Sequence, residues 1–225
     1  MTGSISVQID LRNRLGPARD QGRRPTCLAF AASDAHAGLR APWPPLSCEA
    51  AFFHAQRRAK RPSQVGATLP SIIEALAEDG QPLETVWPYL ATLPEPWAAP
   101  DFNDPVYHCI GAPAAPSWDH LVASLESGRL VLMLMMLSQG FFTPDAFGVV
   151  QLHSGPPDPA IRHAVLAVGH GEVGGEPAVL VRNSWGNGWG VDGHAWLPRS
   201  YVAASLFGTA LFKEKSDVSG DPVAA

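Results

Sequence analysis

Cys27 stands where a thiol would be activated for nucleophilic chemistry. It follows a loop that contains Gly22 and Pro25, and it lies in the first turn of an expected helix. Unpaired amide groups and the positive end of the helix dipole favour the thiolate there, and the thiolate is the reactive form of cysteine. A buried, unreactive cysteine is the alternative, because most lone cysteines are structural. Position alone does not decide between the two.

Gln21 lies shortly before this cysteine, within the stretch Asp20-Gln21-Gly22. A side-chain amide at this point can turn back beside the backbone N–H of Cys27. The two donors would then face the oxyanion of a tetrahedral intermediate. A glutamine in a turn is also common as a plain turn residue, so Gln21 supports the reactive interpretation without establishing it.

A histidine and an asparagine further along the chain could complete a catalytic group. His163 opens an otherwise apolar run, where a polar residue is either held by hydrogen bonds or functional. Asn183 ends a later apolar run and is followed by Trp185 and Trp189, set among glycines. We interpret Asn183 as the acceptor for one ring nitrogen of His163, which leaves the other nitrogen for the thiol. Trp185 would cover that hydrogen bond and exclude water.

Three motifs in this order resemble the papain family of cysteine peptidases. They are Asp20-Gln21-Gly22 with Cys27-Leu28-Ala29-Phe30, His163-Ala164-Val165 with Val168-Gly169, and Asn183-Ser184-Trp185-Gly186 with Trp189-Gly190. The resemblance extends from about residue 9 to residue 210, and the spacing from Cys27 to His163 suits papain-type enzymes. It implies that Cys27 is the nucleophile and His163 the general base and acid. Asn183 would orient the histidine, and Gln21 would help to hold the oxyanion.

The order of expected elements is typical of an α+β protein. Helices are expected near 26–40, 48–60, 69–78 and 118–127, and strands near 130–137, 164–168, 177–182 and 194–197. The papain resemblance implies a helical lobe and an antiparallel, β-barrel-like lobe with the active site in the cleft between them. We expect the helical lobe over residues 1–110, with an N-terminal segment that could cross to the other lobe. The β-rich lobe is expected over 111–215, and a disordered tail over 216–225.

The resemblance also implies how substrate is bound and cleaved. Gly66 would pair with the substrate backbone, and Trp185 and Trp189 would form part of the leaving-group side. The expected activity is hydrolysis of peptide bonds in a peptide or protein through a thioester acyl-enzyme, without a cofactor. No metal site is expected, because the histidines and cysteines lack paired ligand spacing. The remaining candidates His153, His170 and His194 are interpreted as surface or strand-edge residues.

Two positions depart from the usual family pattern. The common Cys-Gly-Ser-Cys-Trp stretch reads Arg24-Pro25-Thr26-Cys27-Leu28 here, so the neighbouring disulfide cysteine is absent. Arg162 precedes His163 where many members carry an acid, and we expect this cation to disfavour the protonated imidazole. The three cysteines, Cys27, Cys48 and Cys109, do not describe a disulfide framework, although a single Cys48–Cys109 bridge remains open.

Composition argues against several other classes of protein. With a net charge of −5 and no basic stripe, the chain has no expected nucleic-acid partner. The longest apolar run, 130–137, is too short to cross a bilayer, and the N-terminus lacks the features of a secretory signal. We therefore expect a monomer that is cytoplasmic or delivered as an effector, and that binds no membrane.

Other functions of a papain-like chain remain open from the sequence. One is a thiol peptidase that trims double-glycine leaders, and another is thiol-dependent acyl transfer onto an amine, which would use the same four residues. A third is a non-catalytic peptide-binding module that keeps the papain fold. Retention of Gln21, Cys27, His163 and Asn183 argues against the module, whereas the altered loop around Pro25 keeps it open.

Overall fold

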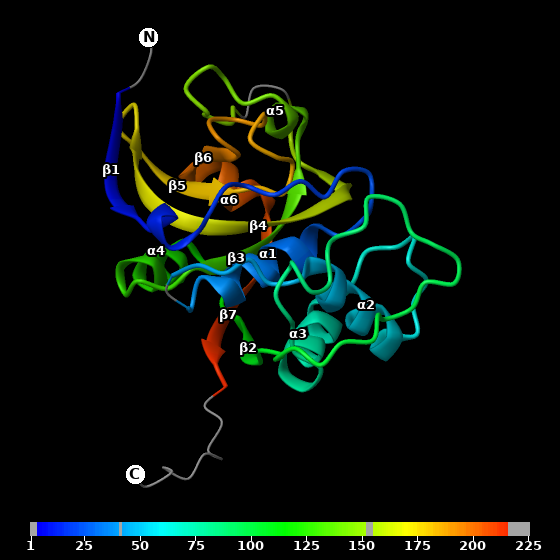
Figure 1. The fold of residues 1–225 in the computed structure, drawn as a ribbon. Coiled ribbons are helices and arrows are strands. Elements are labelled where there is room, and N and C mark those ends of the chain that lie inside the picture. Colours follow the sequence, from blue (N-terminus) through cyan, green and yellow to red (C-terminus); the bar gives the residue numbers. More distant parts are fainter. Residues whose placement is uncertain (1–3, 41, 152–154, 216–225) are drawn as a thin grey trace, which may run out of the picture.

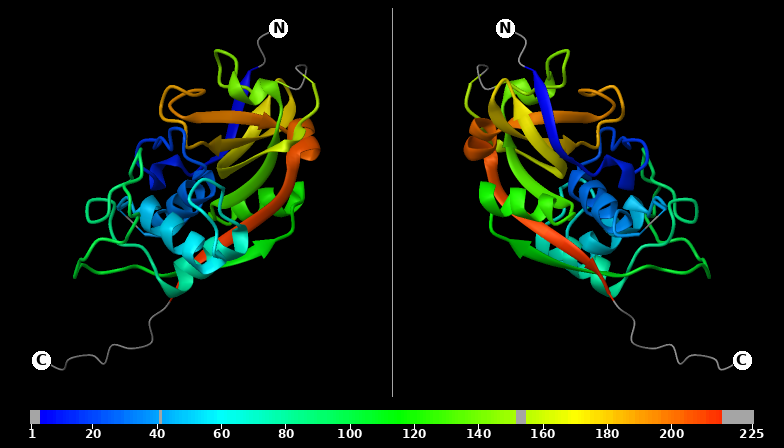
Figure 2. Two further views of the ribbon diagram at one scale, coloured as in Figure 1. Left: turned by 90° about the vertical axis from the view of Figure 1, so that its right-hand side faces the viewer. Right: turned by 90° about the vertical axis from the view of Figure 1, so that its left-hand side faces the viewer.

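The computed structural model describes residues 4–40, 42–151 and 155–215. The predicted disordered tail and His153 lie outside these residues. Three helices from the first half of the chain gather on one side of an antiparallel sheet, which is built mainly from the second half (Figures 1 and 2). The α+β class and the predicted order, a helical part followed by an antiparallel sheet, are therefore confirmed.

The three helices are α1 (Cys27–Ala37), α2 (Cys48–Ala59) and α3 (Leu69–Glu78). Ser47 caps α2 by accepting from the Ala50 N–H, and a capping box that joins Thr68 to Ser71 begins α3. Every residue of α1 after Cys27 is buried. A helix that is buried on all sides needs apolar or small residues all round, which explains its alanine-rich sequence.

The described residues form a seven-stranded sheet with the order β2-β7-β3-β4-β5-β6, and β1 pairs with β4 beside this path. The strands are β1 (Ile5–Asp10), β2 (Cys109–Ala114), β3 (Val131–Leu137), β4 (Asp158–Val173), β5 (Glu176–Arg182), β6 (His194–Pro198) and β7 (Leu206–Glu214). All of their pairings are antiparallel. No described pairing joins the end strands β2 and β6, so the predicted barrel-like closure is wrong and the sheet is open.

The sheet is buried on both faces, as alternate residues of its central strands show. In β4, Ala164 and Leu166 pack in the core shared with α1 to α3, whereas Val165 and Ala167 pack in a second core. That second core also holds residues of α4 (Trp118–Glu126) and α6 (Arg199–Ser205). Burial on both faces explains why these strands read as continuous apolar runs in the sequence.

Strands β1, β2 and β7 were not expected from the sequence. β1 brings residues 5–10 into the sheet, and β2 begins at Cys109, close to the expected division at residue 110. The division into lobes of 1–110 and 111–215 remains our proposal. Among the described residues, no helix has both the length and the apolar character needed to cross a membrane.

Candidate active site

The segment before Cys27 is tied to the end of β5, far away in the sequence. The backbone N–H of Gln21 donates to the carbonyl of Ser184 at 2.8 Å, and the N–H of Gly186 donates to the carbonyl of Arg19 at 3.1 Å. Because α1 begins at Cys27, these bonds fix the start of that helix against the segment that carries Asn183. The fold thus holds the predicted nucleophile and the predicted orienting residue next to each other.

His163 and Asn183 form the hydrogen bond that the sequence predicted. The imidazole Nε2 lies 2.7 Å from the Asn183 Oδ1, and the backbone N–H of Ser184 donates to the same oxygen at 2.8 Å. An amide oxygen only accepts, so Nε2 carries the proton. In the neutral ring, Nδ1 is then the basic nitrogen, and it is the one available for the thiol.

Aromatic rings enclose the imidazole. The ring of Trp185 lies 4.8 Å from that of His163, and the ring of Phe141 lies 5.8 Å away. Trp189 packs behind Trp185 at 5.9 Å, and its indole N–H donates to the carbonyl of Phe141 at 2.9 Å. These contacts restrict rotation of the imidazole and limit access of water to its bond with Asn183.

Burial acts against ionisation of either catalytic group on its own. Burial lowers the pKa of the His163 imidazole to about 4, although the hydrogen bond to Asn183 acts to raise it. It also raises the pKa of the Cys27 thiol, which the backbone N–H groups of Ala164 and Leu28 partly offset. A proton that moves from the thiol to the imidazole must therefore be stabilised by the attraction between the two charges it creates.

The amide of Gln21 is held at both ends. Its Oε1 accepts from the hydroxyl of Ser184 at 2.7 Å, and its Nε2 donates to the backbone carbonyl of Arg24 at 2.8 Å. The nitrogen has two N–H donors, so one of them remains for another acceptor. Gln21 lines the same cleft as Cys27, which allows that donor to serve a developing oxyanion.

Two buried ionic contacts support this arrangement, one carboxylate shared by two arginines and one single ion pair, and neither could be predicted from the sequence. Asp34 on α1 accepts from Arg19 at 2.5 Å and from Arg182 at 2.6 Å, and Arg182 directly precedes Asn183. Burial raises the pKa of the Asp34 carboxyl, but the two arginines outweigh it and hold this pKa below its ordinary value. The helix of the nucleophile is thus joined to the strand that ends at Asn183.

The second ion pair holds the loop immediately before Cys27. Arg24 makes a bidentate contact with Glu49 at 2.5 and 3.0 Å, and its guanidinium also donates to the carbonyl of Leu90. The indole N–H of Trp97 donates to the same carboxylate at 2.9 Å. Arg24 stands where the family pattern predicts a cysteine, so in this chain an ionic contact anchors the loop before Cys27.

The predicted site residues meet in a cleft of about 660 Å³. Gln21, Cys27, Gly66, His163 and Trp185 all line it, and Asn183 lies behind His163. The remaining lining residues are Pro25, Leu28, Arg61, Ala67, Thr68, Leu69, Leu134, Ala160, Ile161, Arg162, Ala164 and Phe207. Trp189 does not line the cleft, since only 6% of it is exposed behind Trp185.

The other two cysteines have no such setting. Cys27, Cys48 and Cys109 are all free, so the possible Cys48–Cys109 bridge is absent. Cys48 and Cys109 are fully buried, and burial raises the pKa of the Cys109 thiol to about 12. Cys27 is the partly exposed one of the three, as a reactive thiol must be. Among the described residues, no group of three or more His, Cys, Asp or Glu side chains could hold a metal ion.

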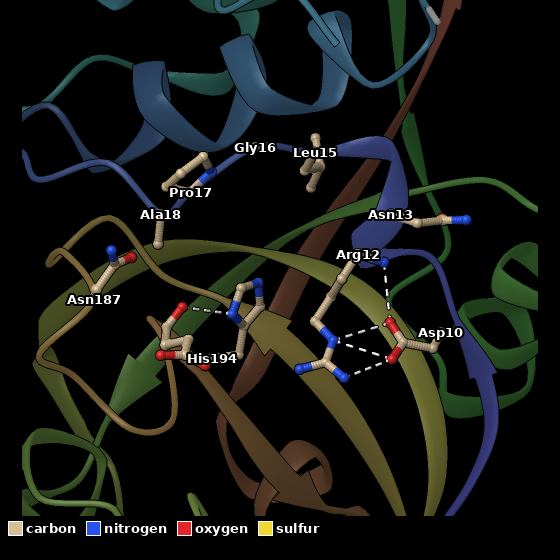
Figure 3. Close-up of a pocket in the computed structure, with 10 residues that line it drawn as sticks. Asp10, Arg12, Asn13, Leu15, Gly16, Pro17, Ala18, Asn187 and His194 are labelled. Carbon is tan, nitrogen blue, oxygen red and sulfur yellow. Dashed lines mark hydrogen bonds and ion pairs between the residues drawn. The ribbon is translucent and has the colours of Figure 1, made fainter. Parts of the chain in front are cut away.

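A second cavity, of about 690 Å³, lies between the N-terminal segment and the loop that leads into β6 (Figure 3). Its polar groups largely satisfy one another: Arg12 contacts Asp10 at 2.6 Å, and His194 Nδ1 donates to the carbonyl of Asp192 at 2.8 Å. No cysteine lines this cavity. His170 is 4% exposed and lies within β4, so its expected surface or strand-edge position is wrong. His194 is 7% exposed and so is not a surface residue, but it begins the end strand β6, as the strand-edge alternative expected.

Comparison with known proteins agrees with the resemblance seen in the sequence and with the fold. Residues 119–209 match the family described as papain family cysteine protease. The fold is similar to xylellain, a cysteine protease from Xylella fastidiosa, with a TM-score of 0.75 at 22% identity over 94% of this chain and 87% of that one. It is also similar to a Carica candamarcensis cysteine protease solved with E-64, with a TM-score of 0.72 at 20% identity over 94% and 100% of the two chains.

A curated relative extends the similarity along most of the sequence. A cysteine protease from Blomia tropicalis is 26% identical over 217 residues, which is 91% of this chain and 64% of that protein. The chain thus spans less than two thirds of the relative's length. The chain thus has a papain-like fold, and its residues 119–209 match the papain family of cysteine proteases.

Proposed function

We propose that this protein is a cysteine endopeptidase that hydrolyses peptide bonds through a thioester acyl-enzyme. The observation that carries the proposal is the meeting of Cys27, His163 and Gln21 on one cleft, with Asn183 accepting from His163 Nε2. Each of these groups has the donor or acceptor that its role requires.

In the first half of the reaction, His163 Nδ1 takes the proton of Cys27, and the sulfur attacks the carbonyl carbon of the substrate. The resulting oxyanion accepts from the free N–H of Gln21 and from the backbone N–H of Cys27. The imidazolium then returns its proton to the leaving amine, and the C–N bond breaks. In the second half, His163 removes a proton from water, which attacks the thioester and frees the thiol.

The walls of the cleft supply substrate binding. We propose that Gly66 pairs with the substrate backbone and that Trp185 contacts the leaving-group side. We assign to Trp189 the support of Trp185 from behind, because its ring packs against that side chain and its own N–H is used by Phe141.

Labelling with an epoxide thiol inhibitor tests the proposal. E-64, which is bound in the Carica candamarcensis structure, is expected to modify Cys27 alone and to leave Cys48 and Cys109 free, as mass mapping would show. The variant His163→Ala should lose this labelling, because the thiol then has no base. A folded wild-type protein that does not react would instead support a non-catalytic, papain-fold binding module.

Loss of one oxyanion donor gives a second prediction. Gln21→Ala is expected to lower kcat by about 10²-fold or more while KM changes little, because the oxyanion exists only in the transition state and the intermediate. Ser184→Ala should cause a smaller loss, since it only frees the amide to rotate. Steady-state kinetics on one peptide substrate would measure both. An unchanged kcat in Gln21→Ala would contradict the oxyanion role.

We further propose that the enzyme acts as a monomer, without nucleic acid or membrane, in the cytoplasm or as a delivered effector. Three free cysteines suit a reducing compartment, and the net charge of −5 suits a protein that binds no nucleic acid. Sedimentation of the purified protein would test the oligomeric state.

A further inference from the structure

The charges along the cleft differ from those of the whole chain. The chain carries a net charge of −5. The permanently charged residues that line the cleft are Arg61 and Arg162, and no aspartate or glutamate lines it. The cleft is therefore locally cationic on a protein that is anionic overall, and its field favours a ligand of opposite charge.

Arg61 stands beside the segment that we propose to bind the substrate backbone. Its Nη2 donates to the carbonyl of Gly66 at 3.1 Å, and the side chain is exposed. No ion pair joins it to an acid within the part of the chain that the structure describes. Its remaining N–H groups are available to a substrate that runs along Gly66.

Arg162 stands on the opposite wall, next to His163. Its guanidinium lies 5.4 Å from the ring centroid of Phe207, and its Nε approaches the carbonyl of Pro159 at 3.3 Å. This exposed side chain, too, has no acidic partner among the described residues. An aromatic ring under a guanidinium holds it in place without neutralising its charge.

Several of the other residues that line the cleft are apolar. Leu69 comes from the helical side, and Leu134, Ile161 and Phe207 come from the sheet. An apolar side chain of a substrate would be buried against these residues. A bound peptide thus meets an apolar cleft that also carries two cations without an acidic partner among the described residues.

From this arrangement we propose that the cleft selects peptides in which an apolar residue is flanked by aspartate or glutamate on the acyl side of the scissile bond. The inference rests on the proposed peptidase function and adds the substrate class. The acidic group belongs to a side chain of the substrate and not to its C-terminal carboxylate. A C-terminal carboxylate would lie on the leaving-group side of the cleft, and that side is aromatic. There Trp185 stacks on the exposed ring of Phe142 at 5.3 Å, and neither arginine takes part in that stack.

The expected preference is moderate, since both arginines are exposed to solvent. An acidic residue next to one of them should raise kcat/KM by roughly 5-fold over its amide counterpart. Most of the gain should appear in KM, because a charge remote from the reacting atoms stabilises the bound substrate and the transition state alike. The preference should fall as salt rises to about 1 M, where exposed charges are screened within a few ångströms.

The experiment compares quenched fluorescent peptides that share one apolar anchor and differ only by Asp or Glu against Asn or Gln at the flanking positions. Wild type is expected to favour the acidic peptides. Arg61→Gln and Arg162→Gln should each remove part of the preference, and Arg61→Glu with Arg162→Glu should reverse it toward basic peptides. Arg199→Gln is the matched control, because Arg199 lies on α6 over the ring of Trp118 and should leave the preference unchanged.

Three results would overturn the inference. Equal rates for acidic and amide peptides would do so, as would a preference that survives in both glutamine variants. A requirement for a free over an amidated C-terminus would place the anion on the leaving-group side and not on the acyl side of the scissile bond. If the neutral peptides are still cleaved and E-64 still labels Cys27, the proposed function stands and only this inference fails. If no peptide is cleaved and no label is taken up, both fail together.

Discussion

Replacing His163 with alanine is expected to lower kcat for peptide hydrolysis by about 10⁴-fold or more. Among the described residues, His163 is the histidine that lines the cleft with Cys27, and both halves of the proposed reaction use its imidazole. Burial raises the pKa of the Cys27 thiol, so without the imidazole little thiolate would form at neutral pH. Single-turnover kinetics on a peptide substrate would measure the loss.

Asn183 should act only through this histidine. Asn183→Ala is expected to lower kcat by about 10²-fold, because the freed ring can rotate and change its tautomer. The double variant should then be no slower than His163→Ala alone, since a residue that orients a missing group has nothing left to contribute. Losses that add in the double variant would show that Asn183 contacts the substrate itself.

His54→Ala is the matched control for both variants. His54 is also partly buried, but it lies on α2 beside Asp79 at 3.5 Å and lines no part of the cleft. Its removal should leave kcat within about 2-fold of wild type. A large loss there would mean that the assay reports general damage to the fold.

The parts of the structure that could be predicted from the sequence carry their signals locally. The expected helix at 69–78 matches α3 in both bounds, because a capping box begins it and Gly80, with φ of 71°, follows its end. The bond between His163 and Asn183 was likewise predicted, from the residue types and the tryptophans that follow. In each case the signal lies in residues that are adjacent in the sequence: those at the two ends of α3, and the tryptophans that follow Asn183.

The strands that were missed have no such local pattern. β1 is mostly exposed and forms an outer strand beside β4, so it lacks an apolar run. β2 contains Gly111 and Pro113, which are unusual in strands, and it forms an edge of the sheet, where proline is tolerated. These elements are stabilised by pairing with distant strands, and a short window of sequence cannot report that pairing.

The buried ion pairs could not be predicted for the same reason. Glu49 looks like a first-turn acid of an exposed helix, and Arg24 looks like a solvated loop residue. Only the folded chain shows that Glu49 is fully buried and bound to Arg24. The sequence did show that the disulfide cysteine was missing from this loop, but not which contact anchors the loop in its place.

Glu49→Ala is expected to lower the free energy of unfolding by about 3–5 kcal/mol. The substitution would leave the guanidinium of Arg24 buried without its counter-charge, and it would remove the acceptor of the Trp97 indole and of the Leu90 N–H. Urea unfolding followed by tryptophan fluorescence would measure the change. Activity should fall as well, because the carbonyl of Arg24 accepts from Gln21 and this loop precedes Cys27.

A matched glutamate separates the effect of burial from that of losing any ion pair. Glu74 also pairs with an arginine, Arg58, at 2.9 Å, but its side chain is 59% exposed. Glu74→Ala should cost less than about 1 kcal/mol, because water already screens that pair. If the two substitutions had similar effects, Glu49 would not anchor the loop through a desolvated charge.

Replacing both buried partners, as Arg24→Met with Glu49→Leu, should recover part of the lost stability, since no unpaired charge then remains inside. Recovery of stability without recovery of kcat would show that the ion pair positions the loop before Cys27 as well as stabilising the fold.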